Sequence, residues 1–161
     1  MIIAALLAKL RTEITIAGDL AKWDFGDGVE RAAIFTAREK PPECGTPYMM
    51  LTQDDGEEYD TREASGDDVW ISVDMFGPKS LSERGIRVLA KKVQNLLHRG
   101  VLTNSSLNQP PYSTDYGYVF VAMRALSPIS IEDGNGFPGF SVDVWVRYYA
   151  DPNLVRASFD D

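Results

Sequence analysis

The sequence lacks the residue types from which most active sites are built. It contains one cysteine, Cys44, and one histidine, His98. A single cysteine excludes an internal disulfide framework and is typical of a reducing compartment. A nucleophilic pair would require these two side chains to meet, yet Cys44 follows two prolines in a loop and His98 lies where a cation complements a helix C-terminus. No motif elsewhere indicates catalysis, so we expect no catalytic residues.

Motifs for cofactors and metals are missing as well. Gly26-Asp27-Gly28 has no lysine at the spacing of a phosphate-binding loop. The segment 133–136 begins like a calcium loop, but it would place Phe137 and Val144 where oxygen ligands are required. The acidic segment 54–68 could hold a divalent cation, although a solvated charged loop is the more common structure for such a run. The sequence therefore predicts no cofactor and no metal site, with a cation at 54–68 as the alternative.

Positive charge is scarce: 16 lysines and arginines stand against 24 acidic residues, a net charge of -8. This balance argues against a protein that coats nucleic acid, because phosphate neutralisation needs a cationic surface. Long hydrophobic runs are absent too, and the apolar start, residues 1–8, is too short to span a bilayer. We expect a soluble protein with no membrane partner, made in the cytosol, and one domain over residues 1–150 with a polar tail at 151–161.

The clearest pattern is a strand followed by an amphipathic helix. In Val69–Phe76, apolar and other residues alternate with the period of a strand that has one buried face. Gly77-Pro78 ends this strand, and Ser80 with Glu83 forms a capping box, which predicts a helix from Leu81 to the glycine at 100. One stripe of the helix is apolar, formed by Ile86, Leu89, Val93, Leu96 and Leu97.

The remaining elements complete an α+β domain. Residues 2–14 place Ile3, Leu6, Leu7, Leu10 and Ile14 on one helical face. Residues 32–36 and 47–52 read as strands, and residues 117–127 should pair with 139–149 as an antiparallel hairpin. The sequence predicts a mainly antiparallel sheet with the N-terminal helix and the long helix packed on one face. Large groups on the opposite face, Trp70, Phe76, Trp145 and Tyr149, indicate that a second layer or a partner subunit covers it.

Charge is segregated along the chain. Residues 54–68 carry eight acids, Asp54, Asp55, Glu57, Glu58, Asp60, Glu63, Asp67 and Asp68, against one arginine. Residues 79–99 carry Lys79, Arg84, Arg87, Lys91, Lys92 and Arg99 against Glu83. We expect the acids Asp54, Asp55, Glu57 and Glu58 of one subunit to contact Arg84, Arg87 and Lys91 of another, with Trp145 and Tyr149 as the second candidates. Pairing within one chain, or simple solvation, is the alternative.

The order of these parts resembles the tail-completion or tail-terminator family of long-tailed bacteriophages and related prophage particles. The residues that carry the resemblance are the N-terminal helix 2–8, the strand opening Pro47-Tyr48, the strand Trp70–Phe76 and the helix segment Ala90–His98. The resemblance spans most of residues 1–150. The chain departs from the family pattern in its Cys44 loop, its long acidic segment and the linker after Gly100.

The resemblance implies a structural subunit rather than an enzyme. Such a subunit assembles into a ring, commonly a hexamer, that caps the tail tube and offers a surface to the head connector. It would lie at the tail-neck junction of the virion after assembly in the host cytoplasm, and DNA would only pass through its bore. Two alternatives remain, another head-tail joining or tail-tube subunit, and a small cytosolic enzyme without a recognisable motif.

Overall fold

The computed structural model describes residues 2–36, 41–54, 57–60, 65–78, 83–100, 102, 118–132, 134 and 136–150. The described helices are α1 (Ile2–Thr12), α2 (Ile14–Ala17) and α3 (Glu83–Leu97). The described strands are β1 (Lys22–Asp24), β2 (Glu30–Ala32), β3 (Ile34–Phe35), β4 (Tyr48–Gln53), β5 (Glu57–Asp60), β6 (Ser65–Phe76), β7 (Tyr118–Ala125), β8 (Ile129–Glu132) and β9 (Pro138–Ala150). Outside these residues lie Ser80 of the predicted capping box, the linker after Gly100 apart from Leu102, and the C-terminal tail.

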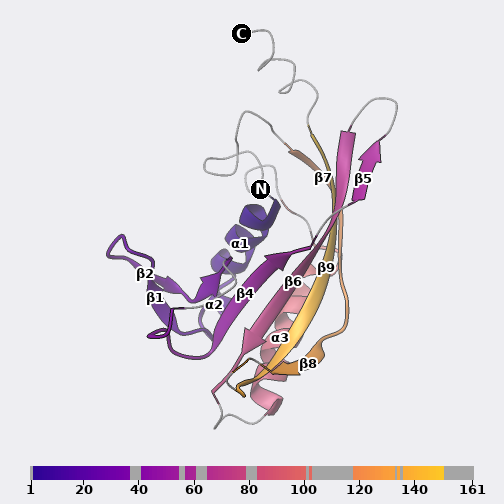
Figure 1. The fold of residues 1–161 in the computed structure, drawn as a ribbon. Helices are drawn as coiled ribbons and strands as arrows, with labels where there is room; N and C mark the ends of the chain where they lie inside the picture. Colours follow the sequence, from indigo (N-terminus) through magenta and orange to yellow (C-terminus); the bar gives the residue numbers. More distant parts are fainter. Residues whose placement is uncertain are drawn as a thin grey trace.

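One mixed sheet organises the molecule, in the strand order β3-β4-β6-β9-β7 (Figure 1). Pairing is antiparallel throughout except between β3 and β4. β6 occupies the centre of this order, as its alternating sequence predicts. The short strands β5 and β8 extend the edges, β5 beside the start of β6 and β8 beside the start of β9.

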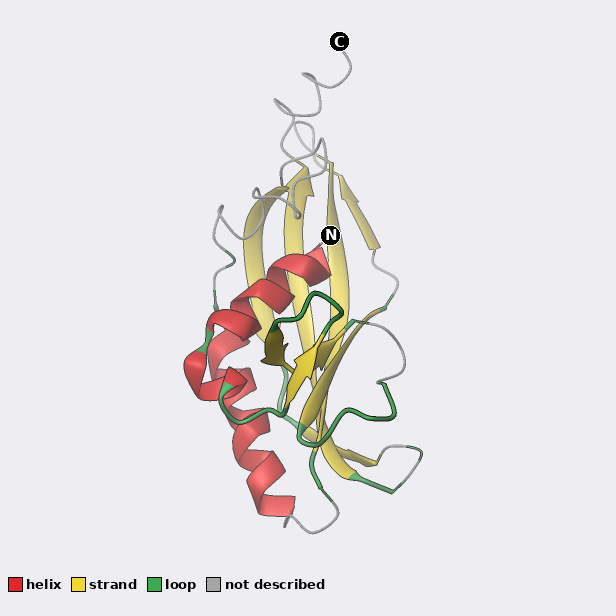
Figure 2. Ribbon diagram, turned by 90° about the vertical axis from the view of Figure 1, so that its left-hand side faces the viewer, coloured by secondary structure: helices red, strands yellow, loops and turns green. Residues whose placement is uncertain are grey.

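The helices α1 and α3 cover one face of the sheet (Figure 2). Val69, Ile71, Val73 and Met75 of β6 are all buried on this face, in one cluster with Leu6 and Leu10 of α1 and with the α3 stripe Ile86, Leu89, Ala90, Val93 and Leu97. The predicted α+β class is confirmed, and so is the packing stripe of α3, in which Leu96 is only partly buried and Ala90 joins the buried residues.

The N-terminal helix is shorter than predicted. Glu13 adopts an extended conformation, with φ -82° and ψ 104°, and separates α1 from α2. Ile14 is therefore 83% exposed instead of lying on the apolar face, while Ile16 takes the buried position. The break turns the chain so that α2 places a different isoleucine in the core.

The predicted 117–127 and 139–149 hairpin is right in its pairing and wrong in its connection. β7 does pair with β9, but the strand β8, which the sequence analysis missed, lies between them in the chain and pairs with the first residues of β9. β7 and β8 thus share one edge of β9. Gly139 in this region faces Phe76, and a Cβ there would overlap the Phe76 ring.

The acidic segment, for which the sequence indicates a loop or a hairpin tip, contains a β-hairpin. Glu57–Asp60 form β5 and pair with Ser65–Asp68 at the start of β6, which begins four residues earlier than predicted. The alternation that marks a strand was hidden here because nearly every residue is polar. The acids therefore lie largely on a β-hairpin.

The helix α3 ends at Leu97, and the residue with left-handed backbone conformation that follows it is Arg99 rather than Gly100. Arg99 has φ 56°, and the Gly100 N–H bonds the Leu97 carbonyl at 3.0 Å. Glycine is needed at 100 for space, because a Cβ would overlap the Leu96 carbonyl oxygen.

Gly26-Asp27-Gly28 forms the turn of a small separate hairpin, β1–β2. Both glycines have positive φ, and their N–H groups donate to the Asp24 carboxylate at 2.8 and 3.0 Å. These donors are occupied by the chain itself, which explains the motif as turn chemistry rather than phosphate binding.

The stability of the fold depends on the buried stripe of α3. Leu89 is 3% exposed and its neighbour Val88 is 50% exposed. Leu89→Ala should lower the free energy of unfolding by about 2–5 kcal/mol, because it leaves a cavity. Val88→Ala is the matched control and should change it by less than about 0.5 kcal/mol. Urea denaturation of both variants measures this, and equal losses would contradict the assigned packing.

Candidate functional site

The sheet face that points away from α1 and α3 carries polar and aromatic side chains. Alternation along β6 places Asp68, Trp70, Ser72 and Asp74 there, since the intervening residues are buried. We call this surface, with its partners from the neighbouring strands, the open face. At the Phe76 end of β6, this face is covered by a second apolar cluster, formed by Ala33, Phe35, Cys44, Tyr48 and Phe76. The second layer that the sequence predicts for this face is therefore present over only part of it.

Two tryptophans meet on the uncovered part of the open face. Trp70 lies opposite Trp145 across the β6–β9 ladder and is 41% exposed. Two arginine guanidinium carbons lie near the Trp145 ring centroid, that of Arg147 at 5.2 Å and that of Arg124 at 5.9 Å. Tryptophan and arginine side chains of this kind are enriched at protein interfaces.

Arg147 is already engaged within the chain. Its Nε and a terminal nitrogen donate to the two Asp68 carboxylate oxygens, at 2.7 and 2.8 Å. This hydrogen bond, with the charge of Arg147, holds the pKa of Asp68 below its usual value. Asp68 is thus paired within its own chain.

Acidic groups lie beside the tryptophans on the open face. The Ser72 hydroxyl donates to the Asp143 carboxylate at 3.0 Å. Burial raises the pKa of the Asp74 carboxyl, and repulsion by Asp143 and Asp54 raises it further, while a hydrogen bond from Ser141 opposes the change. The negative charge on this part of the sheet is therefore costly for the isolated chain.

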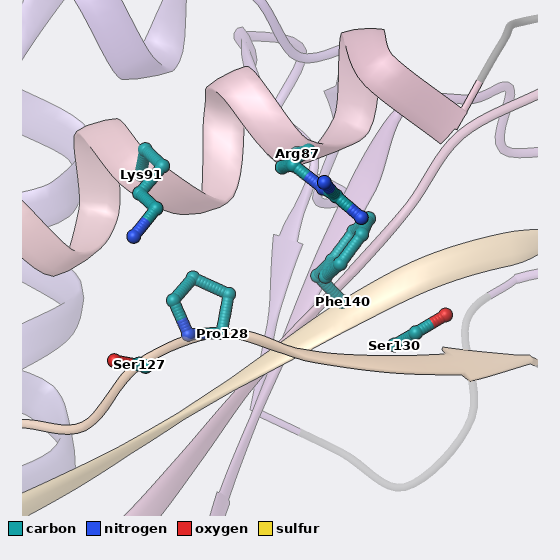
Figure 3. Close-up of a pocket in the computed structure, with 6 residues that line it drawn as sticks. All are labelled: Arg87, Lys91, Ser127, Pro128, Ser130 and Phe140. Atoms are coloured by element: carbon teal, nitrogen blue, oxygen red, sulfur yellow. The ribbon is translucent and has the colours of Figure 1, made fainter.

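The opposite side of the molecule carries a cationic pocket, which we call the α3–β8 pocket (Figure 3). It has a volume of about 280 Å³ and lies between α3 and the segment that leads into β8. Its lining residues are Arg87, Lys91, Ser127, Pro128, Ser130 and Phe140. The Arg87 guanidinium carbon lies 5.4 Å from the Phe140 ring centroid, and the Lys91 amine donates to the Gln94 side chain at 3.3 Å.

Part of the predicted basic surface is used internally. The Lys92 amine donates to the Asp19 carboxylate at 2.6 Å, which ties α3 to the segment after α2. Arg87 and Lys91 are exposed and together form the cationic wall of the pocket. Both have contacts within the chain, Arg87 with the Phe140 ring and Lys91 with the Gln94 side chain.

The other predicted interface residues are described to different extents: some with their side chains, some by their backbone alone, and one not at all. Asp54 is exposed at the end of β4, and Trp145 is half-buried on the open face. Glu57 and Glu58 lie in β5, Arg84 lies in α3 and Tyr149 lies in β9, but their side chains are outside the described part. Asp55 is outside the described residues altogether.

The acidic hairpin and the α3–β8 pocket lie at opposite ends of the molecule. β5 is paired with residues 65–68 of β6, whereas Phe140 of the pocket lies opposite Met75. At about 3.4 Å per residue, these levels of the sheet are roughly 25 Å or more apart. Figure 1 shows the same separation, with β5 at one end and β8 at the other. The screening length at physiological salt is only about 8 Å, so the two charged groups do not pair within one chain.

Cys44 and His98 have separate structural roles. Cys44 is 4% exposed in the second apolar cluster, and the His98 Nδ1 lies 3.1 Å from the Ala125 carbonyl oxygen. Among the described residues, no group of three or more histidine, cysteine or acidic side chains could hold a metal ion. Within the same residues, no helix has the length and apolar character needed to cross a membrane.

Comparison with known proteins finds similarity among solved structures. No protein-family model and no curated protein matches the chain. Among solved structures, the chain resembles a chain from "Virion of native gene transfer agent (GTA) particle", with a TM-score of 0.61 and 15% identity over 91% of this chain and 92% of that chain. At this identity the similarity shows a shared fold that extends over almost the full length of both chains.

The raised pKa of Asp74 predicts how stability depends on pH. An acid whose pKa is raised by folding is favoured in its protonated form, so its contribution is lost as pH rises above the ordinary value of 3.8. Asp74→Asn removes the buried charge and should raise the melting temperature at about pH 7, with little gain at about pH 3.

The matched control for this variant is Asp54→Asn, since repulsion by the exposed Asp54 is the weakest of the causes. It should give a smaller gain at about pH 7, measured in the same calorimetric series. A loss of stability in Asp74→Asn at neutral pH would contradict the assigned direction.

Proposed function

We propose that this protein is a non-enzymatic structural subunit of a phage-like virion, which forms a ring that caps the tail tube and joins it to the head connector. The observation that carries the proposal is the full-length likeness to a chain of a gene transfer agent virion. The order of helices and strands that resembles tail-terminator proteins supports the finer assignment to the tail-neck junction.

A ring requires contacts that join different surfaces of neighbouring copies. A heterologous, head-to-tail contact closes into a ring when its rotation allows, whereas a contact between identical patches stops at a dimer. The cationic α3–β8 pocket and the acidic β5–β6 hairpin are complementary surfaces at opposite ends of one subunit. This placement supports a head-to-tail contact in which the hairpin of one copy meets Arg87 and Lys91 of the next.

Surface ion pairs are individually weak, at about 0–1 kcal/mol each, so the charges would mainly set register and partner choice. Apolar contact area must supply the remaining affinity. Exposed or half-buried apolar side chains beside these charged groups include Trp70 and Trp145 on the open face, Val88 on α3, and Leu126 and Ile129 in the segment that lines the pocket. The net charge of -8 supports a bore through which DNA passes without binding.

Another head-tail joining or tail-tube subunit is the second candidate, because the same virion fold and the same head-to-tail contact would serve it. Its position in an assembled particle distinguishes the two. Labelling the protein in purified particles and imaging them by electron microscopy should place it at the tail end nearest the head; labelling along the whole tail would favour the tail-tube role.

Reversing the cationic wall tests how the ring forms. Arg87→Glu with Lys91→Glu should abolish ring assembly in multi-angle light scattering, because the acidic hairpin would then meet like charge. Circular dichroism should be unchanged, since both side chains are exposed.

The control carries the same net charge. Lys22→Glu with Arg31→Glu reverses two exposed or half-exposed cations on the β1–β2 hairpin and should leave rings intact. If the control variant lost ring assembly to the same extent as the pocket variant, the cause would be general charge repulsion. That result would contradict the proposed contact.

The absence of catalysis is tested separately. Cys44→Ala together with His98→Gln should leave ring assembly unchanged, because Cys44 fills an apolar cluster and His98 contacts only a backbone carbonyl in the described structure. Particle infectivity or DNA transfer by virions carrying the double variant is the measurement. Loss of that activity with rings intact would favour the enzyme alternative.

A further inference from the structure

Large apolar side chains gather on the uncovered part of the open face. Trp70, which is 41% exposed, lies opposite the half-buried Trp145. Leu126 is 48% exposed, and its N–H bonds the Asp143 carbonyl, which places it at the side of β9 on the same face. Ile129 is 58% exposed and reaches this face through the pairing of β8 with β9. Single exposed apolar residues are common on protein surfaces, whereas a group of neighbours marks a binding surface.

A carboxylate lies among these apolar groups. Asp143 is half-buried and accepts a hydrogen bond from the Ser72 hydroxyl at 3.0 Å. Within the part of the chain that the structure describes, it forms no salt bridge. Asp74 lies one row further along the face, where burial and then repulsion by Asp143 raise its pKa. A partner that brings one cation among apolar groups would complement this surface.

The uncovered part of the open face has the width of one helix. It spans the strands β4, β6, β9 and β7 and the rows of β9 from 141 to 145, which is roughly 14 Å in each direction at the usual strand spacing and rise. An α-helix with its side chains is about 10–12 Å across. Two open faces would bring their own acids together, so this surface is not suited to pairing with itself.

The outward side of α3 has the chemistry that the open face requires. Val88, Lys91 and Asn95 are exposed, and their i, i+3, i+7 spacing places them in one line, which we call the α3 ridge. The ridge points away from the sheet, because the apolar stripe of the helix faces the core. Lys91 donates to the Gln94 side chain at 3.3 Å, and this neutral partner does not balance its charge. The ridge thus offers an apolar side chain, 50% exposed, beside a cation.

We infer that the open face of one copy of this chain receives the α3 ridge of a second copy. In this contact Val88 packs against Trp70 and Leu126, and Lys91 lies beside Asp143. The inference rests on the proposed head-to-tail assembly and names the apolar part of its contact. The helices lie on the opposite side of the sheet from the open face, so a chain cannot fill its own face (Figure 2). Each copy carries one surface of each kind, which allows the contact to repeat around a ring.

Two variants that each keep only one of the surfaces test the contact. Val88→Asp disrupts the ridge and keeps the open face, whereas Leu126→Asn with Ile129→Asn disrupts the open face and keeps the ridge. Sedimentation velocity should show each variant alone as a monomer and an equimolar mixture as a dimer, with a Kd at least about tenfold below that of either variant with itself. Circular dichroism should be unchanged, since all three side chains are exposed.

The matched control is Val29→Asp, because Val29 is 52% exposed and lies just before β2. This variant should assemble as the unmodified chain does.

The charge pair is tested within the mixed dimer. Lys91→Gln is placed in the copy that supplies the ridge, and Asp143→Asn in the copy that supplies the open face. Each change should weaken the dimer by about tenfold, and both together should weaken it no more than either alone, since either change already removes the pair.

The inference is overturned if the mixture remains monomeric or if the effects at 91 and 143 simply add. Dimers of Val88→Asp alone would also overturn it, because they would indicate that two open faces pair with each other. Ring assembly of the unmodified chain is measured in parallel by light scattering. Rings without mixed dimers would overturn this inference and leave the proposed function standing. Mixed dimers without rings would support the contact and contradict the ring.

Discussion

The register between β6 and β9 is the constraint on which the rest of the structure depends. The ladder runs from Gly66 opposite Tyr149 to Phe76 opposite Gly139, and it sets valines against valines on the helix-covered face. A slip of one residue would move Trp70 and Asp74 into the core and the valines into solvent. The same register pairs Asp68 with Arg147, so the buried core and the open face are specified together.

This ladder also determines where the acidic hairpin and the cationic pocket lie. Because β5 extends the start of β6 and β8 extends the start of β9, the two strand additions lie at opposite ends of an antiparallel pair. The acidic hairpin is attached to one addition and the cationic pocket to the other. Complementary charges that a single chain keeps apart are available to a second copy, which links the topology of the sheet to the assembly we propose.

Local periodicity correctly predicted those strands and helices whose hydrophobic pattern lies within one continuous segment. Alternation in Val69–Phe76 and in β9, and the apolar stripe of α3, indicated the central strands and the packing helix correctly. Local patterns are weak where elements are short or polar, as in β8, with four residues, and in β5. The break at Glu13 was missed because Ile14 continues the helical apolar pattern, although the structure exposes it. Asp68 and Arg147 are 79 residues apart, and no local pattern encodes such a pair.

The candidate surfaces are largely separate from the interactions that hold the fold. Along α3, Arg87 and Lys91 are exposed while Leu89 and Ala90, between them in sequence, are buried, so the helix packs on the core with one side and forms part of the surface with the other. Phe140 is the exception, because its ring belongs to the core cluster and also supports the Arg87 guanidinium. Through Phe140, the packing of the core restricts the orientation of a surface cation. Preorganisation of this kind lowers the entropy lost when a partner binds, and it favours this surface for the head-to-tail contact that we propose.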